Sequence, residues 1–465
     1  MLSFERGTIL CRELDPDAME STECPHLHLL WDPRVEAYRA PASSYREIVE
    51  SLHRSKVEYK DQVLDLVPCP APLHLTQALG LRDYQEEALE KWWLAGKKRG
   101  VVVLPTGAGK TYVALAAIDK LNRDRISKPS PTFIIVPTLD LVDQWISELR
   151  GSFNVEIGEY TGRSKVLKPI TVATYDSAYI HAEHLGNRFK FLIVDEVHHL
   201  PAENYRQIAQ AFAAPYRLGL TATYEREDEL HKALPELLGG KIFEVGVKEL
   251  AGKHLAEYRV ETFKLPLAAE ERAAYTEQSK VFADYIRSSR IRMTGPQDFQ
   301  KIILRSGSDP RAWKAVRAQS EARKIAYNSQ TKLEKLRELL EEHRGDRLII
   351  FTRYNDLVYR ISQRFLIPAI TYRTGKEERR QVLQGFKDGT YQAIVSSQVL
   401  DEGVDVPEAN VGIILSGTGS SREFIQRLGR ILRPAPGKRA ILYELVSAET
   451  GEVRTASKRK NRDAT

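Results

Sequence analysis

The chain of 465 residues carries 69 lysines and arginines against 63 aspartates and glutamates, so its net charge is +6, and 42% of its residues are hydrophobic. These proportions are typical of a globular protein with two or three domains and argue against a disordered chain. The sequence has no apolar run near the ~20 residues of a membrane-spanning helix and no secretory signal peptide. Cys11, Cys24 and Cys69 lack metal-ligand spacing and suit a reducing compartment, so we expect a cytoplasmic protein with no membrane partner.

The first 72 residues are expected to form a small α+β module that ends in a linker. Two short stretches, Gly7–Cys11 and His26–Trp31, resemble strands, and Tyr45–Arg54 resembles a helix. The prolines of Pro68–Pro72 interrupt regular structure, which is typical of a connection between domains. No pattern in this module predicts a chemical activity.

Two series of alternating strands and helices follow, at 73–255 and 331–446. Their strands are short unbroken apolar runs, the pattern of strands that are buried on both faces of a parallel sheet. We expect strands at Val101–Leu104, Phe133–Val136, Thr171–Ala173, Phe191–Val194 and Arg217–Leu220, and then at Leu348–Phe351, Ala393–Ser396, Gly412–Leu415 and Ile441–Leu445. The fold class is therefore predicted to be α/β, with two tandem parallel-sheet domains.

The segment between the two series, 256–330, is polar, basic and helical in pattern. Residues 271–325 hold twelve lysines and arginines against six aspartates and glutamates, so the net charge of this window equals that of the whole chain. Most rows of charge are solvated helix faces, but a row with few acids suits phosphate groups and predicts binding that weakens with salt. The candidate nucleic-acid contacts are Arg287, Arg290, Arg292, Arg311, Lys314 and Arg317. The last residues, 447–465, are expected to form a basic flexible tail.

A phosphate-binding loop is predicted after the strand Val101–Leu104, although the strict motif has glycine where this chain has Leu104. Backbone N–H groups and a helix N-terminus face the phosphates in such a loop, the lysine reaches the β- and γ-phosphates, and the hydroxyl binds Mg²⁺. The candidate residues are Thr106, Gly107, Ala108, Gly109, Lys110 and Thr111. An ordinary strand–helix turn is the alternative, which the Lys-Thr pair disfavours.

An acidic pair, Asp195 and Glu196, directly follows the apolar run Phe191–Val194. We expect Asp195 to hold Mg²⁺, directly or through water, and Glu196 to orient and deprotonate the attacking water. The alternative is a solvated strand end. Of the histidines that follow, His198 and His199, one is expected to couple the nucleotide site to the rest of the protein, and either could be a hydrogen-bonding residue only.

A second domain without a phosphate loop can supply positive charge to a nucleotide that the first domain holds. Arg430 and Arg433 lie three residues apart, on one face of an expected helix. Arginines in this role typically contribute about 10³–10⁵ in rate. A basic surface helix is the alternative, and the strand and loop just upstream, Ser396–Asp405, favour the catalytic interpretation.

These motifs occur together in the order of the superfamily 2 helicases, which the chain resembles over about residues 75–445. The motifs are Leu81–Gln85, Leu104–Thr111, Asp195–His198, Leu220–Thr223 and Gln426–Arg433. Within that superfamily the chain is most similar to XPB-type DNA helicases, archaeal ones in particular, because it has the Asp-Glu-Val-His form and Arg226-Glu227-Asp228 after Thr-Ala-Thr. The resemblance implies two RecA-like domains, a thumb at the basic insertion and a damage-recognition domain at the N-terminus.

The resemblance also implies residue roles and cofactors, namely ATP and Mg²⁺. It assigns adenine recognition to Gln85, with Arg82 beside it, γ-phosphate sensing to Gln426, and nucleotide contact or coupling to Gly403 and Asp405. It places Arg226, Glu227 and Asp228 at the DNA strand junction, where a charged surface turn with a local ion pair is the alternative. Thr221 and Thr223 are implied to relay between the nucleotide and DNA sites.

The sequence as a whole therefore predicts an ATP-driven DNA helicase or translocase that acts on duplex or forked DNA. The family implies 3′→5′ movement, a place in nucleotide excision repair or transcription, and a nuclease partner in the archaeal branch. Two alternatives stay open: an RNA helicase or annealing factor with the same motor, and an ATP-gated DNA clamp that recruits a nuclease and unwinds little.

Overall fold

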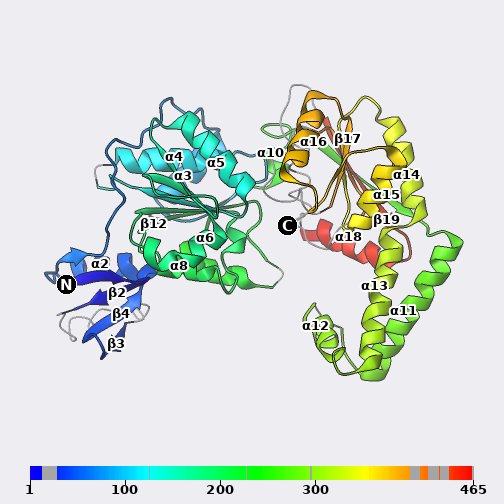
Figure 1. Ribbon diagram of the computed structural model, residues 1–465, viewed down its shortest axis with the longest axis horizontal. Coiled ribbons are helices and arrows are strands. Elements are labelled where there is room, and N and C mark those ends of the chain that lie inside the picture. Colours follow the sequence, from blue (N-terminus) through cyan, green and yellow to red (C-terminus); the bar gives the residue numbers. More distant parts are fainter. Residues whose placement is uncertain are drawn as a thin grey trace. The chain divides into compact units, whose positions relative to one another are not determined.

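The computed structural model describes residues 1–12, 29–124, 126–226, 228–293, 296–397, 409–416, 429 and 439–462, without the side chains of 296, 297, 439 and 458–462. Two compact units divide the chain, one that contains Met1–Leu250 and one that begins at Ala251. Figure 1 shows an α/β sheet domain in each of them. Among the described residues, no helix has the length and apolar character needed to cross a membrane.

The N-terminal module is a five-stranded sheet with one helix packed on it. Its strand order is β3-β4-β2-β1-β5, antiparallel except for the β1–β5 pair. The elements are β1 (Leu2–Glu5), β2 (Thr8–Cys11), β3 (Leu30–Asp32), β4 (Ala37–Pro41), α2 (Tyr45–Arg54) and β5 (Asp61–Gln62). The expected helix is confirmed. Of the expected strand His26–Trp31, the last two residues lie in β3, Leu29 precedes that strand, and 26–28 fall outside the described residues.

The module is fixed to the first α/β domain ahead of the proline-rich linker. Arg46 of α2 donates to the carbonyl of Lys97 at 2.6 Å, and Glu47 of the same helix pairs with Arg99, the first residue of the strand β6 (Arg99–Val103). The amide of Val67 donates to the carbonyl of Arg188 at 2.9 Å. The module is therefore held to the domain that follows it by α2 and by the segment just before the linker.

The first α/β domain contains an eight-stranded sheet of order β13-β6-β12-β11-β7-β10-β8-β9, parallel except for the β8–β9 pair. Its strands are β6 (Arg99–Val103), β7 (Thr132–Val136), β8 (Ile157–Tyr160), β9 (Lys165–Val166), β10 (Ile170–Thr174), β11 (Phe191–Asp195), β12 (Tyr216–Thr221) and β13 (Lys241–Glu244). Its helices are α3 (Asp83–Trp93), α4 (Lys110–Arg123), α5 (Leu139–Ser152), α6 (Tyr175–Ile180), α7 (Ala182–Leu185), α8 (Arg206–Ala211), α9 (Leu234–Leu238) and α10 (Val247–Leu250).

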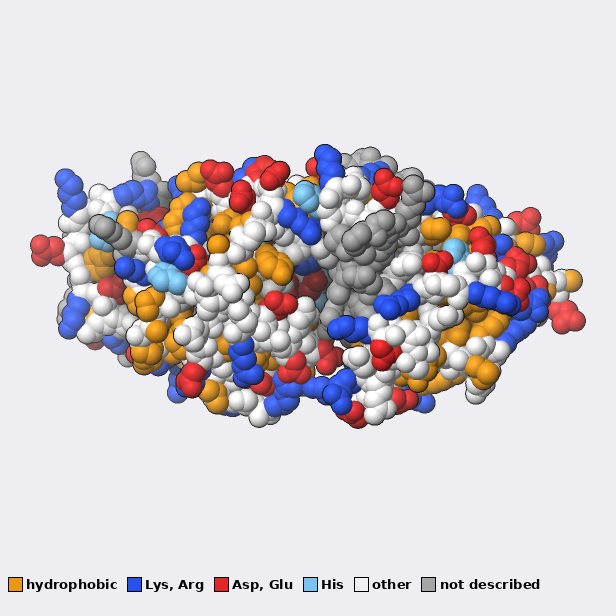
Figure 2. Space-filling model, turned by 90° about the horizontal axis from the view of Figure 1, so that it is seen from above, with side chains coloured by type: hydrophobic (Ala, Val, Ile, Leu, Met, Phe, Trp, Pro, Cys, Tyr) orange, Lys and Arg blue, Asp and Glu red, His pale blue; other side chains and the backbone are white. Residues whose placement is uncertain are grey.

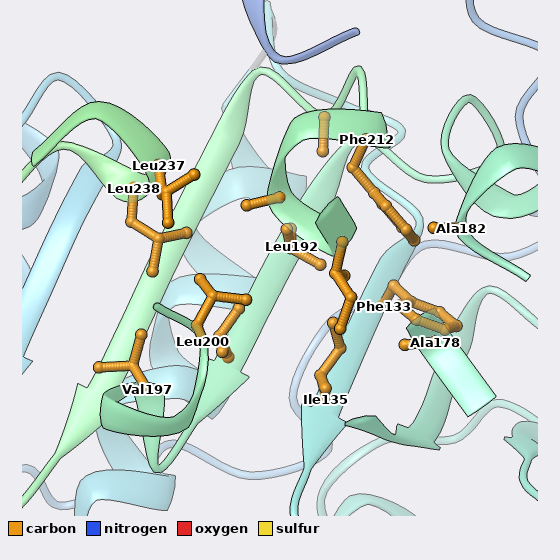
Figure 3. Packing of buried hydrophobic residues seen from close by; sticks show 14 of the residues in the cluster. Phe133, Ile135, Ala178, Ala182, Leu192, Val197, Leu200, Phe212, Leu237 and Leu238 are labelled. Carbon is orange, nitrogen blue, oxygen red and sulfur yellow. The ribbon is translucent and has the colours of Figure 1, made fainter. Parts of the chain in front are cut away.

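The five predicted strands of this domain are confirmed to within a residue or two, and they form the middle of its sheet. Their side chains are buried on both faces, as unbroken apolar runs require. Figure 3 shows one of these faces, where Phe133 of β7 and Leu192 of β11 lie in a cluster with Phe212 and with Leu237 and Leu238 of α9. Each such side chain contributes about 1.5–3 kcal/mol when it is fully buried.

The second α/β domain contains a six-stranded parallel sheet of order β14-β19-β18-β15-β17-β16. Its elements are β14 (Glu257–Leu265), α14 (Gln330–Glu342), β15 (Leu348–Phe351), α15 (Asn355–Phe365), β16 (Ala369–Ile370), α16 (Lys376–Asp388), β17 (Ala393–Ser396), β18 (Val411–Ile414) and β19 (Arg439–Ser447). The four predicted strands are confirmed. The expectation that residues 256–330 are helical throughout is wrong at β14, which pairs with β19 over nine residues at the sheet edge.

The basic insertion is helical from Ala269 on, and we call residues 269–327 the thumb. It consists of α11 (Ala269–Ser289), α12 (Pro296–Arg305) and α13 (Pro310–Tyr327), and α11 runs along α13 in Figure 1. One face of α13 carries buried alanines at Ala312, Ala315, Ala318, Ala322 and Ala326. Small side chains at this spacing let two helices approach closely, so the charged residues of α13 are left on its other faces.

The expectation of a flexible C-terminal tail is wrong for most of its length, because Gly451–Arg462 form the helix α18. Glu452 in its first turn binds Lys332 of α14, with the lysine Nζ at 2.8 and 2.7 Å from the two carboxylate oxygens. Both side chains are buried, with exposed fractions of 0% for Lys332 and 2% for Glu452. The Lys332–Glu452 ion pair could not be predicted from the polar composition of the tail, because a single buried ion pair leaves no periodic pattern in the sequence.

Candidate nucleotide site and its acidic turn

The predicted phosphate loop lies between β6 and α4, at the carboxyl edge of the first sheet. Gly107 and Gly109 have φ angles of +83° and +77°, a left-handed region that disfavours residues with a Cβ. Gly109 is the N-cap of α4, so no side chain occupies the helix N-terminus. The loop therefore presents backbone and a helix dipole to an anion, and it fits the triphosphate of a nucleotide.

Side chains of α3 bind the backbone of this loop. Gln85, which is buried, accepts from the amide of Arg82 at 2.9 Å and donates to the carbonyl of Ala108 at 2.9 Å. The hydroxyl of Tyr84 donates to the same carbonyl at 2.8 Å. A Cβ built on Gly109 would lie 2.4 Å from Gln85 Nε2. Gln85 thus supports the loop in this structure, and its contact with adenine stays a prediction.

Lys110 brings the phosphate loop and the acidic pair together. Its Nζ lies 3.4 Å from the carbonyl oxygen of Leu104 and 4.0 Å from Glu196 Oε1, and both charged side chains are mostly buried. An unscreened cation between the loop and a carboxylate attracts phosphate strongly, because few water molecules compete with it. Thr111 follows in the first turn of α4, where its hydroxyl can face a metal bound to the phosphates.

Asp195 is the last residue of β11 and is buried. Burial raises the pKa of its carboxyl group, while the charge of Lys110 and hydrogen bonds from Trp145 Nε1 and the Glu196 amide, each at 2.9 Å, favour the carboxylate. Among the described residues no cluster of three or more acidic, histidine or cysteine side chains could hold a metal alone. Thr111 and Asp195 suit Mg²⁺, which takes few protein oxygens and completes its shell with phosphate and water.

Glu196 adopts the left-handed conformation, with φ and ψ of +46° and +53°. This conformation costs a non-glycine residue about 1–3 kcal/mol and occurs often at functional sites. The hydroxyl of Tyr175 lies 3.0 Å from the carbonyl oxygen of Asp195 and 3.2 Å from that of Glu196. We call Asp195–His199 the acidic turn.

The acidic turn continues into the residues that the sequence placed near DNA. His198 is buried, and its Nδ1 lies 3.4 Å from Glu196 Oε2 and 3.1 Å from the hydroxyl of Thr221. The Thr221 hydroxyl donates to the carbonyl of Thr223 at 2.8 Å. Arg226 in turn donates to the carbonyl of His198. Contacts therefore connect Glu196 to Arg226 within one domain.

Arg226 also forms the local ion pair that the sequence left open as an alternative. It binds Asp228 through two hydrogen bonds, of 2.9 and 2.6 Å. The guanidinium group lowers the pKa of Asp228 to about 2. Because this pKa lies below its ordinary value, near 3.9 in an unfolded chain, the pair stabilises the fold above about pH 4 and is lost only as the pH falls toward 2.

Six predicted site residues lie outside the described residues and stay predictions. They are Glu227, Gly403, Asp405, Gln426, Arg430 and Arg433. The candidate thumb contacts are described and are all exposed: Arg287, Arg290, Arg292, Arg311, Lys314 and Arg317. On the face that Figure 2 shows, basic and acidic side chains are interspersed. The basic row Arg311, Lys314 and Arg317 on α13 is therefore more informative about nucleic-acid contacts than the net charge of the chain.

Three tryptophan and tyrosine residues of these sites were missed by the sequence reasoning. Trp145 and Tyr175 contact the acidic turn, and no motif signals this because they lie 50 and 20 residues before Asp195. Trp313 is 53% exposed, and the guanidinium carbon of Arg317 lies 5.4 Å from the centre of its ring. A tryptophan inside a basic row was the available signal for Trp313.

A phosphate loop, an adjacent acidic turn and two parallel-sheet domains define a class of nucleotide-driven motors built on RecA-like domains. Comparison with family models supports this assignment to a class. A model described as type III restriction enzyme, res subunit, matches residues 78–226. The helicase conserved C-terminal domain matches 331–435, and the xeroderma pigmentosum group B helicase damage recognition domain matches 2–63.

Individual proteins refine this assignment. The chain is 44% identical to the DNA 3′-5′ translocase XPB2 of Sulfurisphaera tokodaii, over 93% of this chain and 95% of that protein. It is 31% identical to the DNA 3′-5′ helicase XPB of Mycobacterium tuberculosis, over 84% of this chain but 65% of that longer protein. The helicase domain of Pyrococcus furiosus Hef shares the fold, with a TM-score of 0.54 and 18% identity over 82% of this chain and 98% of that one. The chain belongs to the XPB helicase family.

Proposed function

We propose that the chain is an ATP-dependent DNA helicase or translocase that moves 3′→5′ on duplex or forked DNA. The observation that carries the proposal is the meeting of Lys110 and Glu196, 4.0 Å apart, beside a phosphate loop. The substrate and the direction are supported by the two XPB relatives, whose names specify DNA and 3′-5′ movement.

Each group of the nucleotide site has a task in hydrolysis. Lys110 and the N-terminus of α4 bind the phosphates, and Thr111 and Asp195 would hold Mg²⁺, which neutralises charge on the phosphates when bound. Glu196 takes the proton of the attacking water, and the neighbouring His198 fixes where its carboxylate points. Gln85 and Arg82 keep the loop in the shape that receives the nucleotide.

The second domain completes the site in this proposal. Arg430 and Arg433 supply charge at the γ-phosphate, Gln426 senses it, and Gly403 and Asp405 contact or couple the nucleotide. Closure of one domain on the other around ATP and their separation after hydrolysis then drive movement along DNA.

We propose that Arg226 couples this cycle to DNA. Its guanidinium is shared between Asp228 and the carbonyl of His198, which belongs to the acidic turn. A DNA phosphate that attracts Arg226 competes with both partners, because phosphate accepts the same bidentate hydrogen bonds as a carboxylate. Binding of DNA at Arg226 thereby changes the contact between His198 and Glu196. Glu227 and Asp228 act with Arg226 at the strand junction in this proposal.

The thumb contributes a basic surface that binds the DNA backbone. Arg287, Arg290 and Arg292 cluster near the C-terminal end of α11. The basic row on α13, which consists of Arg311, Lys314 and Arg317, lies away from the buried alanine face of that helix. The exposed ring of Trp313 beside Arg317 adds a flat apolar surface of the kind that bases stack on.

We expect the triple change Arg311→Gln, Lys314→Gln and Arg317→Gln to lower DNA affinity and to reduce the slope of log affinity against log salt by up to about 3. Each lost phosphate contact removes about 0.9 from that slope. Fluorescence anisotropy with a labelled fork at several salt concentrations measures it. The matched control changes three exposed basic residues elsewhere in the second unit, Arg337, Arg344 and Lys387. An equal change of slope in both triple variants would contradict the assignment.

The cellular setting is proposed from the N-terminal module and the family. The match of residues 2–63 to a damage recognition domain supports a place in nucleotide excision repair, with transcription as the other setting that the family implies. We propose a nuclease as a protein partner, as in archaeal members of the family, and the cytoplasm as the location.

One set of assays tests the proposal. ATP hydrolysis is measured without nucleic acid and with duplex DNA, single-stranded DNA or RNA, and strand displacement is measured on forks with a 3′ or a 5′ tail. We expect stimulation by DNA and displacement that requires the 3′ tail, and loss of both activities in Lys110→Ala. Stimulation by RNA alone would favour an RNA helicase, and strong duplex-stimulated hydrolysis without displacement would favour an ATP-gated clamp.

A further inference from the structure

Trp145 makes a direct contact with the carboxylate expected to hold Mg²⁺. It lies on α5, which follows β7, the neighbour of β11 in the sheet. Its indole Nε1 donates to Asp195 Oδ2 at 2.9 Å, while Oδ1 accepts from the amide of Glu196, also at 2.9 Å. An indole nitrogen can only donate, so this contact requires an oxygen that accepts and it fixes the plane of the carboxylate.

Tyr175 contacts the backbone of the same turn from a second element, which follows the strand on the far side of β7. It is the first residue of α6, directly after β10, and its side chain is buried. Its hydroxyl reaches the carbonyl oxygens of Asp195 and Glu196, which flank the left-handed φ angle of Glu196. A hydrogen bond at this point stabilises a conformation that the backbone alone disfavours.

Both residues restrain the groups that are expected to do the chemistry. We propose that Trp145 and Tyr175 are positioning residues for hydrolysis: Trp145 orients the Asp195 carboxylate toward Mg²⁺, and Tyr175 holds the turn that aims Glu196 at the attacking water. This inference rests on the proposed function, because it assigns roles within the same nucleotide site. Partners of metal ligands typically change metal affinity or activity by 10–100-fold when they are removed.

The decisive variants are Trp145→Phe and Tyr175→Phe, which remove one donor each and keep an aromatic ring. We expect Trp145→Phe to raise the Mg²⁺ concentration for half-maximal nucleotide binding by at least ten-fold, measured by titration of Mg²⁺ into protein and a fluorescent ADP analogue. We expect Tyr175→Phe to lower kcat by at least ten-fold, with the Kd of the ADP analogue within two-fold of wild type.

Each variant has a matched control. Trp92→Phe removes a buried indole hydrogen bond of 2.8 Å, to the carbonyl of Arg217. Tyr205→Phe removes a hydroxyl bond of 2.6 Å to Asp176, and its ring neighbours that of Tyr175. We expect both controls to leave Mg²⁺ dependence and kcat within two-fold of wild type. The inference is overturned if the decisive variants fold, as shown by thermal melting, and behave like their controls.

A second measurement needs no variant to fold. In wild-type protein, the indole N–H resonance of Trp145 is expected to shift when Mg²⁺ and ADP bind together but not when ADP binds with a chelator. The resonance of Trp92 serves as the internal reference. An unmoved Trp145 signal contradicts the inference, whereas a wild-type protein that neither binds Mg²⁺-nucleotide nor hydrolyses ATP contradicts the proposed function itself.

Discussion

Replacement of Glu196 by glutamine is expected to lower DNA-stimulated ATP hydrolysis by about 10²–10⁴-fold, the usual contribution of a positioned general base. Glutamine has nearly the same size, so it can keep the left-handed turn and the contact with His198 while it loses the ability to accept a proton. Binding of ATP is expected to persist or to tighten slightly, because Lys110 loses a competing carboxylate 4.0 Å away. Single-turnover hydrolysis and nucleotide titration measure the two effects separately.

Glu203 offers the control for this change, since it is an exposed glutamate a few residues further along the same segment. Glu203→Gln is expected to leave hydrolysis within two-fold of wild type. A Glu196→Gln protein that hydrolyses ATP at the wild-type rate would show that another group activates the water. The assignment of the acidic turn would then be wrong, although the phosphate loop could still bind nucleotide.

The interior of both sheets could be predicted from the sequence, whereas their edges could not. Runs such as Phe191–Val194 and Leu348–Phe351 are apolar without interruption, because strands in the middle of a parallel sheet contact helices on both faces. The edge strand β14 alternates charged and half-buried residues, so its composition resembles that of the helices that follow it. The short outer strands β9 and β13 lack an apolar run for the same reason.

The catalytic groups that lie within a short motif could also be predicted. Lys110 follows its glycines directly, and Asp195 and Glu196 follow their strand, so sequence spacing alone brings each set to the sheet edge. Contacts across the fold left no such signal. Trp145 meets Asp195 only because α5 returns over the neighbouring strand β7, and Arg226 meets His198 only because β12 lies beside β11.

The largest effect on stability is expected from Lys332→Met, which breaks the buried ion pair that anchors α18. The lysine also donates to the carbonyl of Leu415 at 2.7 Å, and Glu452 accepts from the amide of Ser447 at 2.9 Å. Removal of one partner leaves the other charge buried without compensation, which costs about 3–5 kcal/mol. Hydrogen exchange of the amides in Gly451–Arg462 is expected to accelerate by about 10²–10⁴-fold, since each 1.4 kcal/mol corresponds to a factor of ten.

Helix α14, which carries Lys332, also contains the matched control. Its Lys335 forms a more exposed ion pair of similar length, 2.8 Å, with Glu338. Lys335→Met is expected to change exchange in α18 by less than about five-fold, as pairs at the surface contribute up to about 1 kcal/mol. A double variant, Lys332→Met with Glu452→Leu, is expected to recover part of the lost protection, because it removes the uncompensated charge together with its partner. If Lys332→Met and Lys335→Met gave equal exchange rates, α18 would be held by its apolar contacts alone. The difference between the two variants therefore measures how far one buried pair, invisible in the composition of a basic tail, fixes the C-terminal helix to the second domain.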